Sequence, residues 1–290
     1  MSRIAYVNGR YVPHGEACVH VEDRGFQFAD GVYEVCEIWD GYIVDMTRHL
    51  DRLARSLNEL QMDWPVERRA MESILRETAR RNRVKKGLVY LQVTRGVARR
   101  DFAFPKTPIP ATLVVTARSV PPGNAVKIGE EGIAVVTTPD IRWERVDIKT
   151  VALLPQVLAK QKAVRAGAKE AWMYDKDGFI TEGASSNAWI VNQDGTLVTR
   201  PAERGILRGI TRAAIMDFAA AHDIKVEERP FTIDEAKAAR EAFITSATMT
   251  ATPVVKIDET PIGNGAPGSV VSELRARFHE GVEKLPLSVY

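Results

Sequence analysis

The chain has 290 residues, of which 45% are hydrophobic and 27% are charged, and its formal net charge is +2. This ordinary composition gives no reason to expect nucleic acid or an anionic membrane as a partner. Two cysteines, Cys18 and Cys36, exclude a disulfide framework and lack the spacing of a metal site. The cysteine spacing leads us to expect no metal. The N-terminal stretch has no apolar signal region and no segment is apolar for long enough to span a bilayer, so we expect a cytoplasmic protein.

Strand and helix signals alternate along residues 1–118. Asn-Gly and Asp-Gly turns predict two β-hairpins, and leucines at a helical spacing predict a helix with one apolar face. The elements expected in this part are hairpins at 4–12 and 32–45, helices at 46–60 and 66–82, and strands at 87–95 and 111–117.

The sequence RSVPPGN, residues 118–124, is the best candidate for a linker, because Pro-Pro-Gly continues neither a helix nor a sheet. We therefore expect an N-terminal α/β domain at 1–118, an interdomain linker at 119–124 and a C-terminal α+β domain at 125–290. The elements expected after the linker are helices at 154–168, from near 210–211, and at 269–285, and strands at 132–143, 170–178, 179–191, 195–200, 242–247 and 253–258. Strands adjoin strands too often for a regular βαβ array, so the whole chain is predicted to have an α+β fold in two domains.

The stretch GNGAPG, residues 263–268, matches the dinucleotide-binding pattern G-x-G-x-x-G, with a predicted strand before it and a predicted helix after it. The sequence offers no second strand to complete a βαβ unit, and Pro261 and Pro267 crowd the loop. A plain Gly/Pro turn is therefore favoured.

The stretch DIRWERVDIKTVALL, residues 140–154, places Lys149 in a β-branched triplet beside an apolar run. A free lysine amine has a pKa of about 10.4 and must lose its proton before it can form a Schiff base. Apolar surroundings could desolvate the amine, and Arg142 and Arg145 could supply a positive potential. From this segment alone, a solvated lysine at a strand edge is the more ordinary interpretation.

Glu182 lies in FITEGASSNAWIV, between two strand-like runs and beside small residues. Opposite a pyridine nitrogen, a carboxylate in this position would keep the nitrogen protonated through a charge-assisted bond worth about 1.5–3 kcal/mol. The alternative interpretation is an ordinary turn glutamate.

The sequence GILRGITRA places Ile210 and Thr211 at the start of a predicted helix, where unpaired N–H groups suit a phosphate. Arg52, on the leucine-striped helix, could add a bidentate phosphate contact. A lysine nucleophile, a carboxylate for a pyridine nitrogen and a phosphate site together match the needs of pyridoxal 5′-phosphate, PLP.

Seven motifs in order, nearly end to end, resemble those of the class IV aminotransferases, which are fold-type IV PLP enzymes. These motifs are EDRGFQFADGVYEV (22–35), HLDRL (49–53), QVTRG (92–96), DIRWERVDIKTVALLPQVLAKQ (140–161), TEGASSN (181–187), ILRGITR (206–212) and ITSATMTATPV (244–254). The stretch GVYEV most resembles family members that act on D-amino acids, whereas branched-chain transaminases usually carry a glycine and an arginine around the position of Val35.

The resemblance implies a role for each matched residue. Lys149 corresponds to the Schiff-base lysine, which would place the PLP lysine in the C-terminal domain, and Glu182 corresponds to the partner of the pyridine nitrogen. The other implied cofactor contacts are Arg52, Leu207, Ile210 and Thr211, and the implied substrate contacts are Tyr33, Val35, Arg100 and Phe102. The family also implies a homodimer with the active site at the domain interface.

Two positions depart from the family's pattern. Phe102 stands where the D-amino acid enzymes have a histidine that, with the arginine matching Arg100, holds the substrate's α-carboxylate. Without this donor, worth about 1.5–3 kcal/mol, Arg100 must hold the carboxylate alone or with Arg99. Ala247 stands where many relatives have a phosphate-binding threonine, so the neighbouring Thr248 is the candidate for that contact.

The implied function is transfer of an amino group from a D-amino acid such as D-alanine to a 2-oxo acid such as 2-oxoglutarate or pyruvate. The more apolar pocket at Phe102 leaves open an (R)-selective amine transaminase, and the shared family leaves open a branched-chain L-amino acid transaminase. A lyase that releases 4-aminobenzoate is less favoured because of GVYEV. A non-catalytic PLP-binding protein is less favoured because Lys149 and Glu182 are both present.

Overall fold

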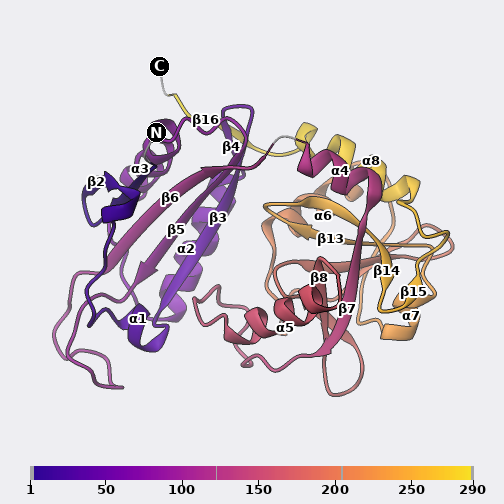
Figure 1. Cartoon of the computed structure of the whole chain (residues 1–290), viewed down its shortest axis with the longest axis horizontal. Helices are drawn as coiled ribbons and strands as arrows, with labels where there is room; N and C mark the ends of the chain where they lie inside the picture. Colours follow the sequence, from indigo (N-terminus) through magenta and orange to yellow (C-terminus); the bar gives the residue numbers. More distant parts are fainter. Residues whose placement is uncertain (1–2, 122, 204, 289–290) are drawn as a thin grey trace. The chain divides into compact units, whose positions relative to one another are not determined.

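The computed structural model describes residues 3–121, 123–203 and 205–288. Its contacts divide the chain into two compact units, whose elements are labelled in Figure 1. The first unit contains the described residues up to Val120 together with 148–152 and 283–288, and the second contains those of 121–147 and 153–282.

The first unit is built on a seven-stranded antiparallel sheet with the strand order β16-β4-β3-β5-β6-β1-β2. Both predicted hairpins, both predicted helices and both predicted strands are present, and a short helix, α1, was not expected. The elements are β1 (Ile4–Val7), β2 (Arg10–Pro13), a 3₁₀ turn (His14–Glu16), α1 (Arg24–Phe28), β3 (Gly31–Trp39), β4 (Tyr42–Val44), α2 (Met46–Glu59), α3 (Arg68–Arg81), β5 (Gly87–Thr94), β6 (Thr112–Ser119) and β16 (Lys284–Pro286).

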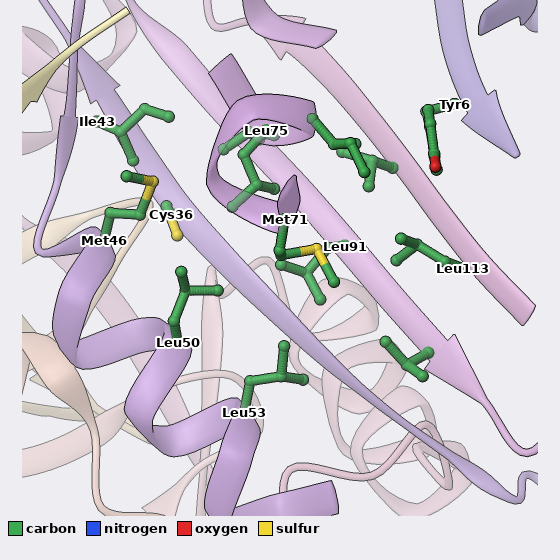
Figure 2. Close-up of a cluster of buried hydrophobic side chains, with 14 of the residues drawn as sticks. Tyr6, Cys36, Ile43, Met46, Leu50, Leu53, Met71, Leu75, Leu91 and Leu113 are labelled. Carbon is green, nitrogen blue, oxygen red and sulfur yellow. The ribbon is translucent and has the colours of Figure 1, made fainter. Parts of the chain in front are cut away.

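The core of the first unit lies between its sheet and helices α2 and α3 (Figure 2). Leu50 and Leu53 of α2 are fully buried, as the helical spacing of the leucines predicts. Met71 and Leu75 of α3 are fully buried in the same cluster. Burying one such side chain is worth about 1.5–3 kcal/mol, so this cluster fixes both helices on the sheet.

Strand β3 alternates between a buried face and a half-buried face. Val32, Glu34 and Cys36 are buried on the face that packs on the α2 leucines. Tyr33 and Val35 are half-buried, and the two-residue period of a strand directs them to the opposite face.

The segment 148–152 belongs to the first unit because it adds to an edge of β3. Val32 and Thr150 form an antiparallel bridge, and the N–H of Tyr33 donates to the carbonyl of Lys149 at 3.0 Å. The opposite edge of β3 is paired with β5 from Gly31 to Ile38. The expectation that the C-terminal domain carries the lysine is therefore wrong, because backbone pairing attaches this segment to the N-terminal sheet.

The second unit is built on a nine-stranded mixed sheet with the order β12-β11-β10-β13-β14-β7-β8-β9, and β15 pairs with β14. Its largest fully buried side chains are Trp172, Trp189, Phe231 and Phe243. The elements are α4 (Asn124–Glu131), β7 (Ile133–Pro139), α5 (Leu154–Arg165), β8 (Glu170–Tyr174), β9 (Ile180–Gly183), β10 (Asn187–Val191), β11 (Leu197–Thr199), α6 (Ile210–Ala221), β12 (Val226–Glu228), α7 (Ile233–Lys237), β13 (Glu241–Ser246), β14 (Thr250–Ile257), β15 (Thr260–Pro261), α8 (Ser269–Arg277) and a 3₁₀ turn (Phe278–Glu280).

Several boundaries differ from the sequence prediction, although the α+β class is confirmed. Helix α4 was not expected, and the range 179–191 contains two strands rather than one. Helix α8 ends at Arg277 rather than near residue 285, because residues 284–286 pair with β4 and satisfy the open edge of the first sheet. The stretch 263–268 is irregular, as the interpretation of a plain turn predicts.

Among the described residues, none of the helices combines the length and the apolar character that crossing a bilayer requires.

Candidate active site

The amine of Lys149 lies over an aromatic face of the first sheet. Its Nζ is 4.4 Å from the centre of the Tyr33 ring, and an ammonium over a tyrosine face is an attractive contact. The Tyr33 ring is 5.6 Å from that of Tyr90 on β5, which lies opposite Val35 in the strand register. Burial, with a smaller contribution from Tyr33, raises the pKa of Tyr90 to about 12, so its phenol stays protonated and donates to Gln92 Oε1 at 2.7 Å. Three predicted residues, Lys149, Tyr33 and Val35, therefore share one face.

The two arginines that were expected to give this amine a positive surrounding are both paired with carboxylates. Arg142 donates to Asp140 and to Glu182. Arg145 donates to both carboxylate oxygens of Asp147, at 3.0 and 3.1 Å. The expectation from sequence loses its basis, because a cation next to a carboxylate contributes little net positive potential.

Arg52 lies on the buried side of β3, where it binds Glu34. Its Nε and Nη2 donate to the two carboxylate oxygens of Glu34, both at 2.7 Å, and His49 Nδ1 lies 2.7 Å from one of those oxygens. Burial opposes ionisation, but Arg52 and His49 together lower the pKa of Glu34 to about 2. Burial lowers the pKa of His49, so a mainly neutral imidazole donates its Nδ1–H to the carboxylate. The bidentate edge of Arg52, which was expected to bind a phosphate, is thus occupied by Glu34.

Arg100 and Phe102 lie close to Phe28 at the end of helix α1. The Arg100 guanidinium is 4.7 Å from the centre of the Phe28 ring, and the Phe102 ring is 5.6 Å from it. Phe102 is 85% exposed, and Arg24 anchors its loop by donating to the carbonyl of Asp101 at 2.7 Å. No carboxylate pairs with Arg100 among the described residues, so its charge can serve an outside anion.

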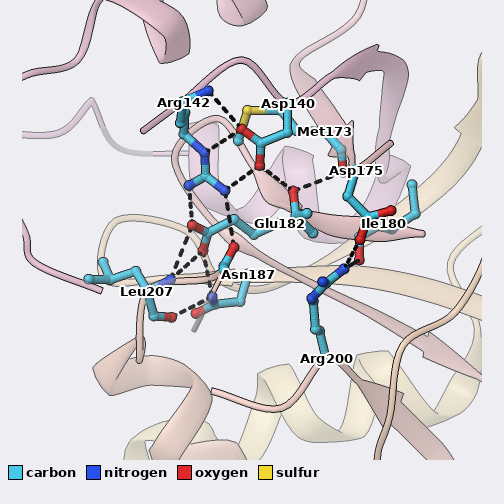
Figure 3. Close-up of polar contacts among 11 residues, drawn as sticks. Asp140, Arg142, Met173, Asp175, Ile180, Glu182, Asn187, Arg200 and Leu207 are labelled. Atoms are coloured by element: carbon cyan, nitrogen blue, oxygen red, sulfur yellow. Dashed lines mark hydrogen bonds and ion pairs between the residues drawn. The ribbon is translucent and has the colours of Figure 1, made fainter. Parts of the chain in front are cut away.

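Glu182, at the end of β9, is the centre of a buried polar network in the second unit (Figure 3). Its carboxylate accepts hydrogen bonds from Arg142, from Asn187 Nδ2 at 2.9 Å and from the N–H of Leu207 at 3.2 Å. The Asn187 amide also donates to the carbonyl of Leu207 at 2.9 Å. These donors favour the ionised carboxylate and fix its direction.

Arg142 is held on its other side by Asp140 (Figure 3). Its Nε and Nη2 donate to the two oxygens of Asp140 at 2.9 and 2.6 Å, and Thr181 Oγ1 donates to the same carboxylate at 2.8 Å. Burial acts against both charges, yet the pairing lowers the pKa of Asp140 and raises that of Arg142. One arginine therefore lies between two carboxylates, Asp140 and Glu182.

Helix α6 begins beside this network. Its N-cap, Gly209, has no side chain to cap the helix, and Ile210 and Thr211 supply the first N–H groups. A Cβ on Gly209 would collide with the amide oxygen of Asn187, so only glycine lets the helix start approach this close. A buried carboxylate and a helix N-terminus thus lie next to each other, because Asn187 both donates to Glu182 and approaches Gly209 closely.

Thr248 lies in the turn between β13 and β14 and is exposed, whereas Ala247 is half-buried. The hydroxyl of Thr248 lies 3.5 Å from that of Ser246. Within the described part of the chain, Thr248 makes no hydrogen bond to the Glu182 network, so its expected phosphate contact stays a prediction. Among the described residues, no group of three or more His, Cys, Asp and Glu side chains could hold a metal ion.

No role was expected from sequence for Asp140 or Asn187, and Arg142 was considered only as a source of positive potential for Lys149. One signal was available, because Asp140 and Arg142 are two residues apart, a spacing at which extended side chains share a face. The partner strand that supplies Glu182 is 40 positions away from Arg142, and nothing local in the sequence indicates that pairing.

A family model described as amino-transferase class IV matches residues 31–257. D-alanine aminotransferase from Staphylococcus haemolyticus is 38% identical over 278 residues, which are 96% of this chain and 97% of that protein. D-alanine aminotransferase from Bacillus licheniformis is 38% identical over 275 residues, or 95% of each protein.

Solved structures with similar folds include a branched-chain aminotransferase from the archaeon Thermoproteus uzoniensis, determined with norvaline. Its TM-score is 0.84 at 26% sequence identity, and the match covers 98% of this chain and 99% of that one. A branched-chain amino acid aminotransferase determined with pyridoxamine 5′-phosphate has a TM-score of 0.89 at 27% identity, and the match covers 97% of this chain and 94% of that one.

Proposed function

The chain belongs to the class IV aminotransferase family, whose members depend on PLP, and we propose that it moves an amino group from a D-amino acid such as D-alanine to a 2-oxo acid such as 2-oxoglutarate or pyruvate. The observation that carries this proposal is the closeness of the Glu182 carboxylate, through Asn187, to the uncapped start of helix α6. The names of the curated relatives and the GVYEV motif favour D-amino acids as donors.

The described residues fit this cofactor. A pyridine ring needs an ionised acceptor for its nitrogen, and Glu182 is a buried carboxylate fixed by donors, which favour the ionised form. A phosphate needs N–H donors, which Ile210 and Thr211 supply at the uncapped start of α6. Leu207 lies between these two groups in the chain and offers an apolar side chain to the ring. Arg52 and Thr248 are further candidates for the phosphate.

When bound, PLP supplies an aldehyde that an amine can join and a ring that takes up electrons from the Cα–H bond of the donor. We propose that Lys149 carries the cofactor and, once displaced by the donor, acts as the general base that accepts and returns the Cα proton. Tyr33 positions this amine by its contact at 4.4 Å. Glu182 holds the proton on the ring nitrogen, while Arg100 binds the substrate carboxylate beside Phe102 and Val35.

We also propose a homodimer that works in the cytoplasm. Helix α5 supports association, because Leu154, Val157 and Leu158 are 68%, 58% and 54% exposed, and grouped apolar side chains of this kind mark contact surfaces. Size-exclusion chromatography with light scattering measures the assembly directly, and a monomer at micromolar concentration would contradict it.

The donor class is tested by single-turnover reactions of the PLP-loaded protein with D-alanine, L-leucine and (R)-1-phenylethylamine. We expect D-alanine to convert the cofactor to its aminated form at least about 100-fold faster than L-leucine, a difference of about 2.7 kcal/mol in activation free energy. The absorbance change of the cofactor measures each rate.

Two outcomes would overturn this assignment. Faster reaction with (R)-1-phenylethylamine would favour an amine transaminase, in agreement with the missing histidine at Phe102. Faster reaction with L-leucine would favour a branched-chain transaminase. Arg100→Ala tests further whether the donor is an amino acid or an amine. It should slow the reaction with D-alanine and leave the rate with the carboxylate-free amine unchanged.

The close approach of helix α6 to Asn187 gives a further prediction. Gly209→Ala should displace the Asn187 amide and weaken PLP binding about tenfold, because about one hydrogen bond to Glu182 is lost. Fluorescence titration of the apoprotein with PLP measures the dissociation constant. Gly15→Ala is the matched control, since no atom lies within 4 Å of its Cβ position, and equal affinities of the two variants would contradict the prediction.

A further inference from the structure

Arg142 presents a chemical difficulty for the carboxylate beside it. Glu182 can hold a proton on a ring nitrogen only if it keeps enough negative charge to attract that proton. An arginine is protonated at any accessible pH, and its side chain here is only 4% exposed. Left unbalanced, a buried cation in contact with Glu182 would compete with the ring nitrogen for the carboxylate.

Asp140 supplies the balance. It accepts hydrogen bonds from two of the three guanidinium nitrogens of Arg142, Nε and Nη2, while Nη1 donates to Glu182. Thr181, next to Glu182 on β9, donates to Asp140 at 2.8 Å and fixes the orientation of its carboxylate. Asp175 and Arg200 form a separate ion pair at 2.8 Å (Figure 3).

We propose that Asp140 is a positioning residue that offsets the charge of Arg142, so that Glu182 keeps a strong hold on the protonated ring nitrogen of the cofactor. This inference rests on the proposed role of Glu182. In this role, Asp140 does not touch the reacting atoms. It acts through Arg142, both by its negative charge and by engaging the Nε and Nη2 of that side chain.

The proposal predicts opposite effects for the two neighbours of Glu182. In Asp140→Asn, Arg142 keeps its full charge and can turn its free edge toward Glu182, so the ring nitrogen should lose its proton at a pH about one to two units lower. In Arg142→Gln, the competing cation is gone, and the ring nitrogen should keep its proton to a higher pH than in the unmodified protein. A purely structural role for Asp140 would not reverse the sign between these variants.

The experiment loads each protein with PLP labelled with ¹⁵N in the ring and follows the ¹⁵N resonance against pH. Asp140→Glu should restore the unmodified profile, and Asp175→Asn is the matched control because it removes an arginine-bound carboxylate that does not touch Arg142. Thermal unfolding of each variant checks that it is folded, and Arg142→Gln alone still tests the sign if Asp140→Asn does not fold.

The outcomes separate the inference from the function on which it rests. An unprotonated ring nitrogen in the unmodified protein would overturn the role of Glu182 itself. A protonated nitrogen whose titration is the same in Asp140→Asn, Arg142→Gln and the unmodified protein would overturn the role of Asp140 alone. Shifts of opposite sign, with an unchanged Asp175→Asn, would support the proposal.

Discussion

Replacing Lys149 with alanine is expected to abolish amino transfer from D-alanine, with a fall in the rate constant of at least about 10⁴-fold. Under the proposed function, this substitution removes both the covalent anchor of PLP and the base that moves the Cα proton. Single-turnover absorbance measures the rate. Borohydride reduction followed by peptide mass spectrometry measures whether the cofactor becomes fixed to residue 149.

Lys86, immediately before strand β5 of the same sheet, provides a matched control. Its Nζ lies 4.4 Å from the centre of the Trp39 ring, the same distance that separates Lys149 from Tyr33, but its side chain is 56% exposed. Lys86→Ala should therefore keep its activity and its cofactor label. Retained turnover in Lys149→Ala, or a label on another lysine of the unmodified protein, would contradict the assignment.

Glu34→Gln is expected to destabilise the protein by about 3–5 kcal/mol, because it leaves the charge of Arg52 buried without its partner. The Arg52 side chain is 9% exposed and that of Glu34 is fully buried. Urea unfolding measures the loss. If Arg52 also contacts the phosphate, the dissociation constant of PLP should rise in the same variant.

Glu77 on α3 is the control for this prediction. Hydrogen bonds from Arg80 and Arg81 lower its pKa to about 2, as low as that of Glu34. Its partners are 62% and 43% exposed, however, so solvent screens the pair, and Glu77→Gln should cost less than about 1 kcal/mol. Equal losses in the two variants would show that burial does not decide the effect.

The pair of Glu34 and Arg52 also makes the stability of the fold depend on pH, with a definite sign. The pKa of Glu34 is about 2 in the folded protein and 4.5 for an ordinary glutamate. A lowered pKa stabilises the fold fully above pH 4.5, and this contribution, of order 3 kcal/mol, declines as the pH falls through that value toward 2. The gap in stability between the unmodified protein and Glu34→Gln should therefore shrink by more than half at about pH 3. A gap that stays constant would contradict this origin.

Local chemistry explains which parts of the fold could be predicted from the sequence. The first hairpin needs left-handed backbone at both turn residues, and Asn8 and Gly9 adopt φ of 44° and 91°. The leucines of α2 reveal their buried face by their spacing alone. Each of these signals lies within a few residues, so no knowledge of the tertiary fold is needed.

The parts that could not be predicted depend on partners distant in the chain. Lys149 is attached to the first sheet through Tyr33, which lies more than 100 positions earlier, and no local pattern indicates this pairing. Arg52 was expected to bind phosphate, but Glu34 on the neighbouring strand takes its bidentate edge. In particular, the spacing of charged residues in the sequence does not indicate which residues form ion pairs with one another.

The discontinuous course of the first unit affects how the protein is made. Its sheet needs strand β16, residues 284–286, to cover the edge of β4. When residues 1–120 have emerged from the ribosome, the sheet is therefore incomplete. Its uncovered edge presents main-chain N–H and C=O groups to any other nascent chain. That edge stays open while more than 160 further residues are translated, so during this time it is available for pairing with a strand of another chain.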